Sequence, residues 1–311
     1  MSILLLTAMD KKILITGITG MLGSAVYRYF FQKKEFKIVG ISRNQDILMP
    51  EVEMFYGDLA SDDLIHSIST MSFDYIIHCA AEVNVNLCET DKEHAYKSNV
   101  LATKNLFSKI KSKKYLYIST DAVFDGSSGN YSEESFTNPL NYYAITKLFG
   151  EDAVKDAVKN YYILRTNIFG FNTPMRKSLF EWGFSELDKG KTINGFSNMY
   201  FNPMYVGQLA TLIAAILTSN IAFGTYHAGT NEIISKFDFL AMIAKSFQFD
   251  AEKVNKILFD PKDSVAPRAL NTTLNNSKTK LVLNDFDFSL EQGFNMLVED
   301  LKKANDVHEK N

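Results

Sequence analysis

Cysteine is scarce in this sequence of 311 residues, where Cys79 and Cys88 are the only two. Two cysteines make neither a disulfide framework nor a ligand set, and no group of His, Cys or carboxylate residues has the spacing of a metal site. A thiol-reducing cytoplasm fits this composition best. We therefore expect a cytoplasmic protein without a metal, in which both cysteines fill space in the core.

A large excess of charge of either sign is also lacking. The formal net charge is -3 and the isoelectric point is about 6.0, so no broad basic field is available to hold nucleic acid or an anionic lipid surface. The apolar run at residues 3–6 is too short to span a bilayer and lacks the features of an export signal. We expect a soluble globular protein without a nucleic-acid or membrane partner.

Hydrophobic residues, by contrast, make up 46% of the chain and follow an alternating pattern. In the first half, short β-branched runs alternate with longer amphipathic stretches, which is typical of strand–helix–strand units in a parallel sheet. The expected strands are 13–16, 36–42, 53–56, 73–78, 115–120 and 161–165. The expected helices are 20–32, 62–70, 89–112 and 141–159. This order predicts a Rossmann-type doubly wound α/β fold, with its ligand crevice at the carboxyl ends of the strands.

The pattern changes after about Gly170, where we expect a second, smaller α/β lobe that binds the substrate. The dinucleotide-binding domain is predicted at 9–170, with 203–222 packing back on it. The substrate-binding lobe is predicted at 171–202 and 223–304. The later elements expected are helices at 203–219, 236–247 and 289–304 and a strand at 224–228.

A glycine triplet, Gly17, Gly20 and Gly23, lies between the first expected strand and the first helix. The first glycine permits a tight turn, the second lets the backbone approach a pyrophosphate, and the third lets helix and strand pack closely. The helix N-terminus then faces the phosphates. The motif predicts a dinucleotide-binding loop, in which Met21 and Leu22 are further expected cofactor contacts.

The second expected strand ends in Ser42-Arg43-Asn44, without the carboxylate that usually holds a free ribose hydroxyl. The guanidinium of Arg43 can pair with a 2′-phosphate, which favours NADP(H) and leaves NAD(H) as the alternative. After the third strand, Asp58 beside Leu59 lies where a carboxylate can take the adenine amino group. Alternatively, Asp58 caps the next helix.

Tyr143 and Lys147 lie four residues apart, and hence on one face of the expected helix 141–159. A neighbouring Lys cation favours the phenolate and lowers the pKa of Tyr143, which can then give its proton to the alkoxide formed when hydride reaches a carbonyl carbon. Lys147 is also expected to hold the nicotinamide ribose. Thr120, at the end of the fifth strand, can donate a hydrogen bond to the substrate oxygen, with Ser119 as the fallback.

These residues together resemble the extended short-chain dehydrogenase/reductase family, and within it the dTDP-4-dehydrorhamnose reductase-like nucleotide-sugar reductases. The resemblance covers nearly the whole chain and rests on segments 14–17, 79–81, 99–100, 119–126, 137–140, 143–151, 224–227 and 266–268. It implies that Cys79, Ala80 and Ala81 line the nicotinamide side of the cofactor path and that Asn99 supports the site. It also implies that Thr120, Tyr143 and Lys147 are catalytic.

The activity that the resemblance implies is NADP(H)-dependent reduction of the keto group of a nucleotide-activated 4-keto-6-deoxysugar, for the biosynthesis of cell-surface polysaccharide sugars. We expect the enzyme to be a homodimer. The expected substrate contacts are Asp121, Val123, Asn202, Tyr205 and Arg268, the last for a diphosphate. Asn202 and Tyr205 have core packing as their alternative.

The sequence leaves the nucleotide of the substrate open and gives two further residues a packing role. These reductases commonly carry a Trp shortly after the arginine of the sixth strand, and this chain lacks it, so the nucleotide base stays open. The single tryptophan, Trp182, is expected to pack on a helix of the second lobe. His78, at the end of the fourth strand, is expected to be a core residue with satisfied hydrogen bonds.

Position 122 separates the competing functions. Ala122 stands where the related 4,6-dehydratases carry an acid and where the epimerase-reductases that make GDP-fucose carry a cysteine, which argues against both. A nucleotide-sugar epimerase remains an alternative. So does a regulatory subunit that binds NADP and catalyses nothing.

Overall fold

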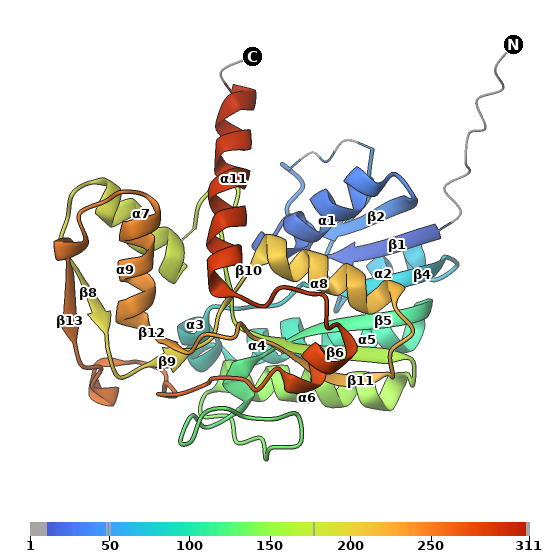
Figure 1. Cartoon of the computed structure of the whole chain (residues 1–311). Coiled ribbons are helices and arrows are strands. Elements are labelled where there is room, and N and C mark those ends of the chain that lie inside the picture. Colours follow the sequence, from blue (N-terminus) through green and yellow to red (C-terminus); the bar gives the residue numbers. More distant parts are fainter. Residues whose placement is uncertain (1–10, 48, 50, 177, 309–311) are drawn as a thin grey trace, which may run out of the picture.

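The structure is a computed structural model that describes residues 11–47, 49, 51–176 and 178–308, so the apolar run at 3–6 lies outside the described residues. Its strands begin with β1 (Lys11–Thr16), β2 (Phe36–Ser42), β3 (Glu53–Tyr56), β4 (Ser72–His78), β5 (Lys111–Thr120), β6 (Tyr161–Thr166) and β11 (Gly224–Ala228). Within the described residues these seven form one parallel sheet in the order β11-β6-β5-β4-β1-β2-β3 (Figure 1). The order reverses between β1 and β4, which is the switch point expected of a doubly wound fold.

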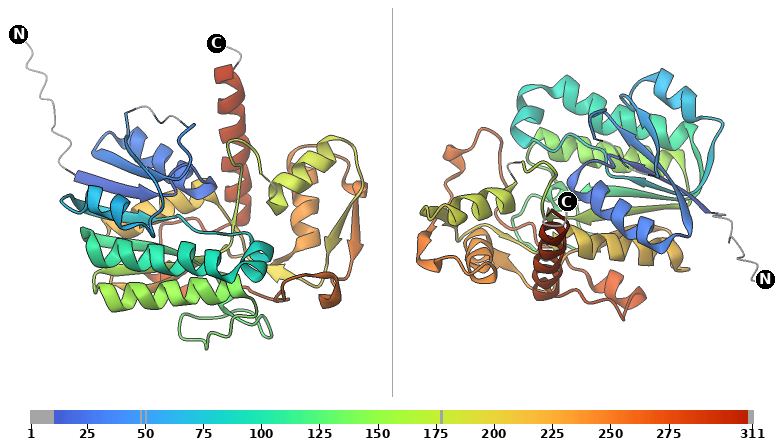
Figure 2. Two further views of the ribbon diagram at one scale, coloured as in Figure 1. Left: turned by 180° about the vertical axis from the view of Figure 1, so that it is seen from behind. Right: turned by 90° about the horizontal axis from the view of Figure 1, so that it is seen from above.

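Helices cover both faces of this sheet (Figure 2). They are α1 (Met21–Lys33), α2 (Asp62–Ile68), α3 (Val85–Thr90), α4 (Lys92–Tyr96), α5 (Ala102–Lys109), α6 (Tyr142–Ala157) and α8 (Val206–Thr218). Alternation along β1 explains the two layers, because Ile13 and Ile15 pack with α1 and α8 whereas Leu14 packs with α2, α5 and α6. The expected Rossmann-type fold is confirmed.

One predicted helix and the domain assignment of one predicted strand differ from the structure. The expected helix 89–112 is divided, because the Asp91 side chain accepts a hydrogen bond from the His94 N–H and starts α4 anew, and Lys97–Leu101 form a π-helical turn. Its last two residues belong to β5. Residues 224–228 form the expected strand, but their assignment to the substrate lobe is wrong, since β11 pairs with β6 in the central sheet. β11 contributes a seventh strand where six were expected.

The second lobe lies beside the sheet and contains α7 (Leu179–Asp188), α9 (Lys236–Ser246), β8 (Ile193–Phe196) and β13 (Val254–Ile257) (Figure 1). Strands β8 and β13 pair in parallel. Phenylalanine rings from α7, α9 and the adjoining loops fill its interior, as in the edge-to-face pair Phe184 and Phe247 at 4.8 Å between centroids. Trp182 lies on α7 as expected and is 39% exposed.

Five short elements and the long helix α11 complete the described chain. They are β7 (Ile168–Phe169), β9 (Tyr200–Phe201), β10 (Met204–Tyr205), β12 (Ile234–Ser235), α10 (Ser277–Val282) and α11 (Leu290–His308). β9 pairs antiparallel with β12 at the base of the second lobe, near α3 (Figure 1). Helix α8 packs against α1, as expected of the segment 203–222.

Candidate active site

The glycine triplet forms the tight loop that the sequence predicts. Gly17 has φ 64°, which a residue with a side chain rarely adopts, and a Cβ there would lie 2.8 Å from the backbone N and Cα of Ala80. A Cβ at Gly23 would collide with the carbonyl of Gly17. The loop therefore needs glycine at both positions, and it brings the α1 N-terminus against the segment that follows β4.

A cavity opens in front of this loop, at the carboxyl ends of β1, β2 and β4. Most of the expected cofactor residues line it: Gly17, Gly20, Ser42, Arg43, Asp58 and Leu59, and on the far side Cys79, Ala80 and Ala81. Met21, Leu22, Asn99, Tyr143 and Lys147 are not among the residues that line it, and their contact with a cofactor stays a prediction. Leu22 and Met21 pack into the core from α1, because the first turn of an amphipathic helix faces the sheet.

A second arginine, which the sequence patterns did not predict as a cofactor residue, lines the same cavity. Arg176 belongs to the segment between β7 and α7, and Glu181 accepts a hydrogen bond from its backbone N–H at 3.0 Å. No motif marks this arginine, because only the fold brings the segment over the cavity. Its guanidinium joins that of Arg43 as a cation available to phosphate.

Asp58 lies at the edge of the cavity. Burial favours a higher pKa for this carboxyl, but the Ala60 N–H hydrogen bond and the Lys97 and Arg43 charges outweigh it and lower the pKa. The N-cap of α2 is Ser61, so the alternative role of Asp58 as helix cap is wrong. The contact of this carboxylate with an adenine amino group stays a prediction.

Helix α6 carries Tyr143, Lys147 and Glu151 at intervals of four residues. The Asn141 side chain accepts a hydrogen bond from the Ala144 N–H at 3.0 Å and so fixes where the helix begins. Lys147 Nζ donates to the Ile118 carbonyl at 2.7 Å and lies 4.1 Å from the centre of the Tyr117 ring. The ammonium is thereby held at the end of β5, beside Cys79 on the cavity wall.

The expected lowering of the Tyr143 pKa by Lys147 is wrong. Burial raises the pKa of Tyr143, and a hydrogen bond with Thr120 only partly offsets it. Burial likewise lowers the pKa of Lys147 to about 7, against the opposing effect of Glu151. Desolvation dominates because both groups lie between helix and sheet, and it keeps the proton on the Tyr143 phenol at neutral pH.

The two hydroxyl groups at the end of β5 face different partners. Ser119 Oγ donates to Glu151 Oε1 at 2.6 Å, in a buried cluster where Arg165 also binds Glu151 through two hydrogen bonds of 2.9 and 2.7 Å. Ser119 is thus occupied. Thr120 lies beside Tyr143, which favours Thr120 over Ser119 as the hydroxyl that contacts the substrate oxygen.

Asp121 holds the Thr120 hydroxyl in place. Thr120 Oγ1 donates to Asp121 Oδ1 at 3.1 Å, while Asp121 Oδ2 accepts from Asn167 at 3.0 Å and from Thr272. Burial raises the pKa of Asp121, and these three donors oppose it. Both carboxylate oxygens already accept hydrogen bonds from the chain, so Asp121 orients Thr120 and ties the second lobe to the sheet.

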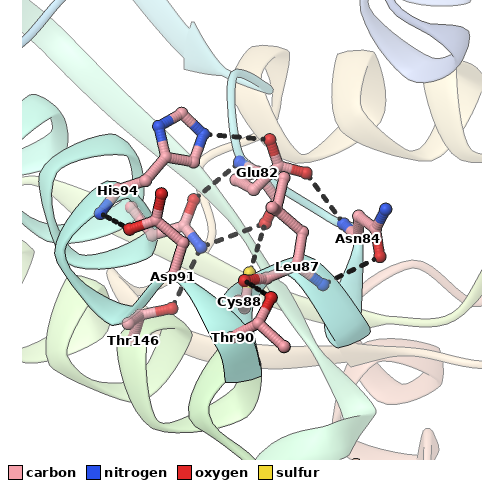
Figure 3. A network of polar contacts seen from close by, with 9 residues as sticks. Glu82, Asn84, Leu87, Cys88, Thr90, Asp91, His94 and Thr146 are labelled. Carbon is pink, nitrogen blue, oxygen red and sulfur yellow. Dashed lines mark hydrogen bonds and ion pairs between the residues drawn. The ribbon is translucent and has the colours of Figure 1, made fainter. Parts of the chain in front are cut away.

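Asn99 supports the site from behind. Its side chain donates to Thr146 Oγ1 and to the Glu82 carbonyl, both at 3.0 Å, and accepts from the Glu82 N–H at 2.8 Å. Figure 3 shows the surrounding network, in which the Glu82 carboxylate also contacts His94 Nε2 at 3.2 Å. The network fastens the segment after β4 to α6, which agrees with a supporting role.

His78 and Cys88 are core residues in this structure, whereas Cys79 is half-buried on the cavity wall, so the expectation that both cysteines fill the core is wrong for Cys79. The His78 ring bonds to Thr16 Oγ1 at 2.6 Å and to Thr103 Oγ1 at 3.0 Å, and burial lowers its pKa to about 3. Cys88 is fully buried, and burial raises the pKa of its thiol to about 11. Burial raises the pKa of the Cys79 thiol to about 12, so neither thiol is a nucleophile at neutral pH.

Three expected substrate contacts are used elsewhere, and a substrate role for them is wrong. The Asn202 side chain donates hydrogen bonds to the Thr230 and Leu274 carbonyls and accepts one from the Leu274 N–H. Tyr205 is 3% exposed and donates to Asp300 Oδ2 on α11 at 2.7 Å. Val123 is fully buried against Phe124, because the helical turn after Thr120 points it inward. Arg268, the third candidate of the second lobe, makes one long hydrogen bond, from Nη2 to Asn86 Oδ1 at 3.4 Å. Its guanidinium can therefore still bind a diphosphate, and this contact stays a prediction.

Residues 11–302 match the family model described as the RmlD substrate binding domain. The chain belongs to this family. It is 30% identical over 281 residues to methionine adenosyltransferase 2 subunit beta of Xenopus laevis, covering 88% of this chain and 82% of the relative.

Solved structures in the RmlD family share the fold. A hypothetical dTDP-4-dehydrorhamnose reductase from Sulfolobus tokodaii is 29% identical with a TM-score of 0.76, over 90% of this chain and 96% of the other. The dTDP-4-dehydrorhamnose reductase from Bacillus anthracis, solved with NADP, has a TM-score of 0.79 at 24% identity, over 93% and 99% of the two chains. The chain therefore shares its fold with dTDP-4-dehydrorhamnose reductases, one of which was solved with NADP bound.

Two other kinds of site were sought in the described part of the chain. It holds no group of three or more His, Cys, Asp or Glu side chains that could bind a metal ion. None of its helices is long and apolar enough to cross a membrane.

Proposed function

We propose that this RmlD-family protein is an NADP(H)-dependent reductase of the keto group of a nucleotide-activated 4-keto-6-deoxysugar, acting in the cytoplasm as a homodimer. One observation carries the proposal: Tyr143 and Thr120 are in contact at the end of β5, and Lys147 lies there beside Cys79, on the wall of the cavity that the glycine loop opens. Carbonyl reduction needs an acid at the oxygen and a nicotinamide at the carbon.

The residues divide the work as follows. Bound in the cavity, NADPH supplies hydride to the carbonyl carbon. Tyr143 gives its proton to the oxygen as negative charge develops there, and the nearby Lys147 cation stabilises that charge. Thr120, held by Asp121 through a 3.1 Å hydrogen bond, is in hydrogen-bond contact with Tyr143 and orients the phenol. The half-buried phenol keeps its proton until negative charge develops on the substrate oxygen.

The purified protein is to be mixed with NADPH and a panel of dTDP-, UDP-, CDP- and GDP-linked 4-keto-6-deoxysugars, and oxidation of NADPH followed by absorbance. We expect stoichiometric NADPH oxidation and a reduced sugar product with at least one nucleotide. No turnover on any member, despite tight NADPH binding, would contradict the reductase.

Arg43→Ala is expected to weaken NADPH binding by about 10-fold and to leave NADH binding unchanged, since a charged hydrogen bond of about 1.5 kcal/mol to the 2′-phosphate is lost. Titration calorimetry with both cofactors measures this. Arg28→Ala, which removes an exposed arginine of α1 that does not line the cavity, is the matched control. Equal losses for NADPH and NADH would remove Arg43 from the 2′-phosphate.

A regulatory subunit that binds NADP is the second candidate, favoured by the 30% identity to a methionine adenosyltransferase subunit. A regulatory role does not require an acid beside the nicotinamide. This chain carries all three expected catalytic residues. Tyr143 is in hydrogen-bond contact with Thr120, and Lys147 binds the Ile118 carbonyl two residues before Thr120, which favours the enzyme. The turnover assay separates the two, and a nucleotide-sugar epimerase would show itself there by changing the sugar without net NADPH oxidation.

A further inference from the structure

Lys236 occupies an unusual position for a lysine. It is the first residue of α9, which begins there because Ser235 and Asp238 form a capping box. A cation in the first turn of a helix opposes the helix dipole, so this lysine does not stabilise α9. The Lys236 N–H donates to the Met199 carbonyl at 2.9 Å, which fixes the residue beside β9.

The Lys236 ammonium has no polar partner among the described residues. Its Nζ lies 3.2 Å from the centre of the Phe201 ring, and no hydrogen bond or ion pair joins it to a side chain or carbonyl of the described chain. The side chain is half-buried. Three N–H donors are therefore presented to the space between the lobes with only an aromatic face beside them.

Two charged groups lie close to this ammonium. The Asp121 carboxylate favours the cation and Arg268 disfavours it, and with burial as the main cause the pKa of Lys236 falls to about 8. Asp121 in turn holds the Thr120 hydroxyl. Lys236 is thus placed on the second-lobe side of the reacting centre, between the catalytic end of β5 and Arg268.

Backbone contacts hold these groups in register. Strand β9 donates from Tyr200 N–H to the Leu270 carbonyl at 2.6 Å and accepts from the Thr272 N–H at 3.1 Å, so the loop that carries Arg268 runs alongside β9. Asn141, the N-cap of α6, donates to the Pro267 carbonyl at 2.9 Å. The helix of Tyr143 and the loop of Arg268 are therefore joined directly, and the Lys236 and Arg268 cations lie near one another.

We propose that Lys236 and Arg268 together bind an oxyanion of the substrate next to the reacting carbon, and that Lys236 determines which substrates are accepted. The Lys236 and Arg268 cations have only one carboxylate, that of Asp121, close to them, and its oxygens already accept hydrogen bonds from other residues. The positive charge and the N–H donors of Lys236 and Arg268 are therefore suited to bind an anionic group of a ligand. A substrate phosphate would meet this need, and so would the carboxylate of a nucleotide-linked uronic acid, which would then replace the 6-deoxysugar as the substrate. The inference rests on the proposed nucleotide-sugar function for its ligand class.

The test uses Lys236→Met, which keeps the unbranched stem and removes the charge. Binding of UDP, dTDP, UDP-glucose and UDP-glucuronic acid to the full chain is measured by titration calorimetry, with NADPH affinity and thermal unfolding as controls for the fold. We expect at least about a 10-fold loss of affinity, as for a lost charged hydrogen bond, and unchanged NADPH affinity. Lys256→Met is the matched control, because Lys256 is an exposed lysine of β13 that lies 5.6 Å from the Phe237 ring.

The pattern of loss identifies the oxyanion. A loss of similar size for all four compounds assigns Lys236 to a phosphate, and a loss confined to UDP-glucuronic acid assigns it to a sugar carboxylate. Wild-type affinity in Lys236→Met, an equal loss in Lys256→Met, or no binding of any compound by the wild type would each overturn the proposal. Binding is measured without turnover, so a protein that binds these compounds but reduces none would contradict the reductase and leave Lys236 in its role.

Discussion

Replacing Tyr143 by Phe is expected to slow carbonyl reduction by about 10²–10⁴-fold, the usual contribution of a positioned general acid. The phenylalanine ring keeps the shape of the side chain, so the fold and the affinity for NADPH should stay as in the wild type. Single-turnover rates at saturating NADPH measure the loss in the chemical step. The large effect follows from the structure, in which Asp121, the other acidic group beside Thr120, already accepts hydrogen bonds from the chain with both carboxylate oxygens.

Tyr142→Phe is the matched control for this experiment. Tyr142 precedes Tyr143 on the same helix and turns about 100° away from it, and its ring lies 5.3 Å from Lys92 Nζ. Its variant should keep nearly all of the activity. If Tyr143→Phe retained more than about a tenth of the wild-type rate, another group would have to supply the proton.

Glu151→Ala is expected to lower the free energy of unfolding by about 3–5 kcal/mol, the range for breaking a buried ion pair from one side. The Glu151 side chain is fully buried and binds both Arg165 and Ser119. Its removal leaves the guanidinium charge of Arg165 buried without a carboxylate, and Nη1 of that guanidinium already lacks a partner among the described residues. Urea unfolding followed by circular dichroism measures the change.

Asp152→Ala serves as the control on the same helix. Asp152 is exposed and pairs with Lys155 at 3.3 Å, a surface contact worth less than about 0.5 kcal/mol. If both alanine variants lowered the stability by the same small amount, the buried pair would contribute no more than a surface pair. Glu151 would then have a different role from the one its burial indicates.

Local patterns were enough to predict the first domain. Strand 36–42, strand 53–56 and the glycine loop agree with the structure because they depend on side-chain periodicity and on backbone conformations that only glycine adopts. The same holds for the spacing of Tyr143 and Lys147, which helical geometry places on one face. The family resemblance added the expected cofactor wall at residues 79–81, which lines the cavity.

What the sequence by itself determined, then, is the doubly wound sheet, the phosphate loop and the helix that carries Tyr143. Only the tertiary structure decided that Asn202, Tyr205 and Val123 serve packing, that β11 joins the central sheet, that Arg176 lines the cavity and that Lys236 lies near Asp121. It also decided that burial raises the pKa of Tyr143. The physical reason is that desolvation and contacts between distant segments depend on the packing of the whole chain, which no local spacing encodes.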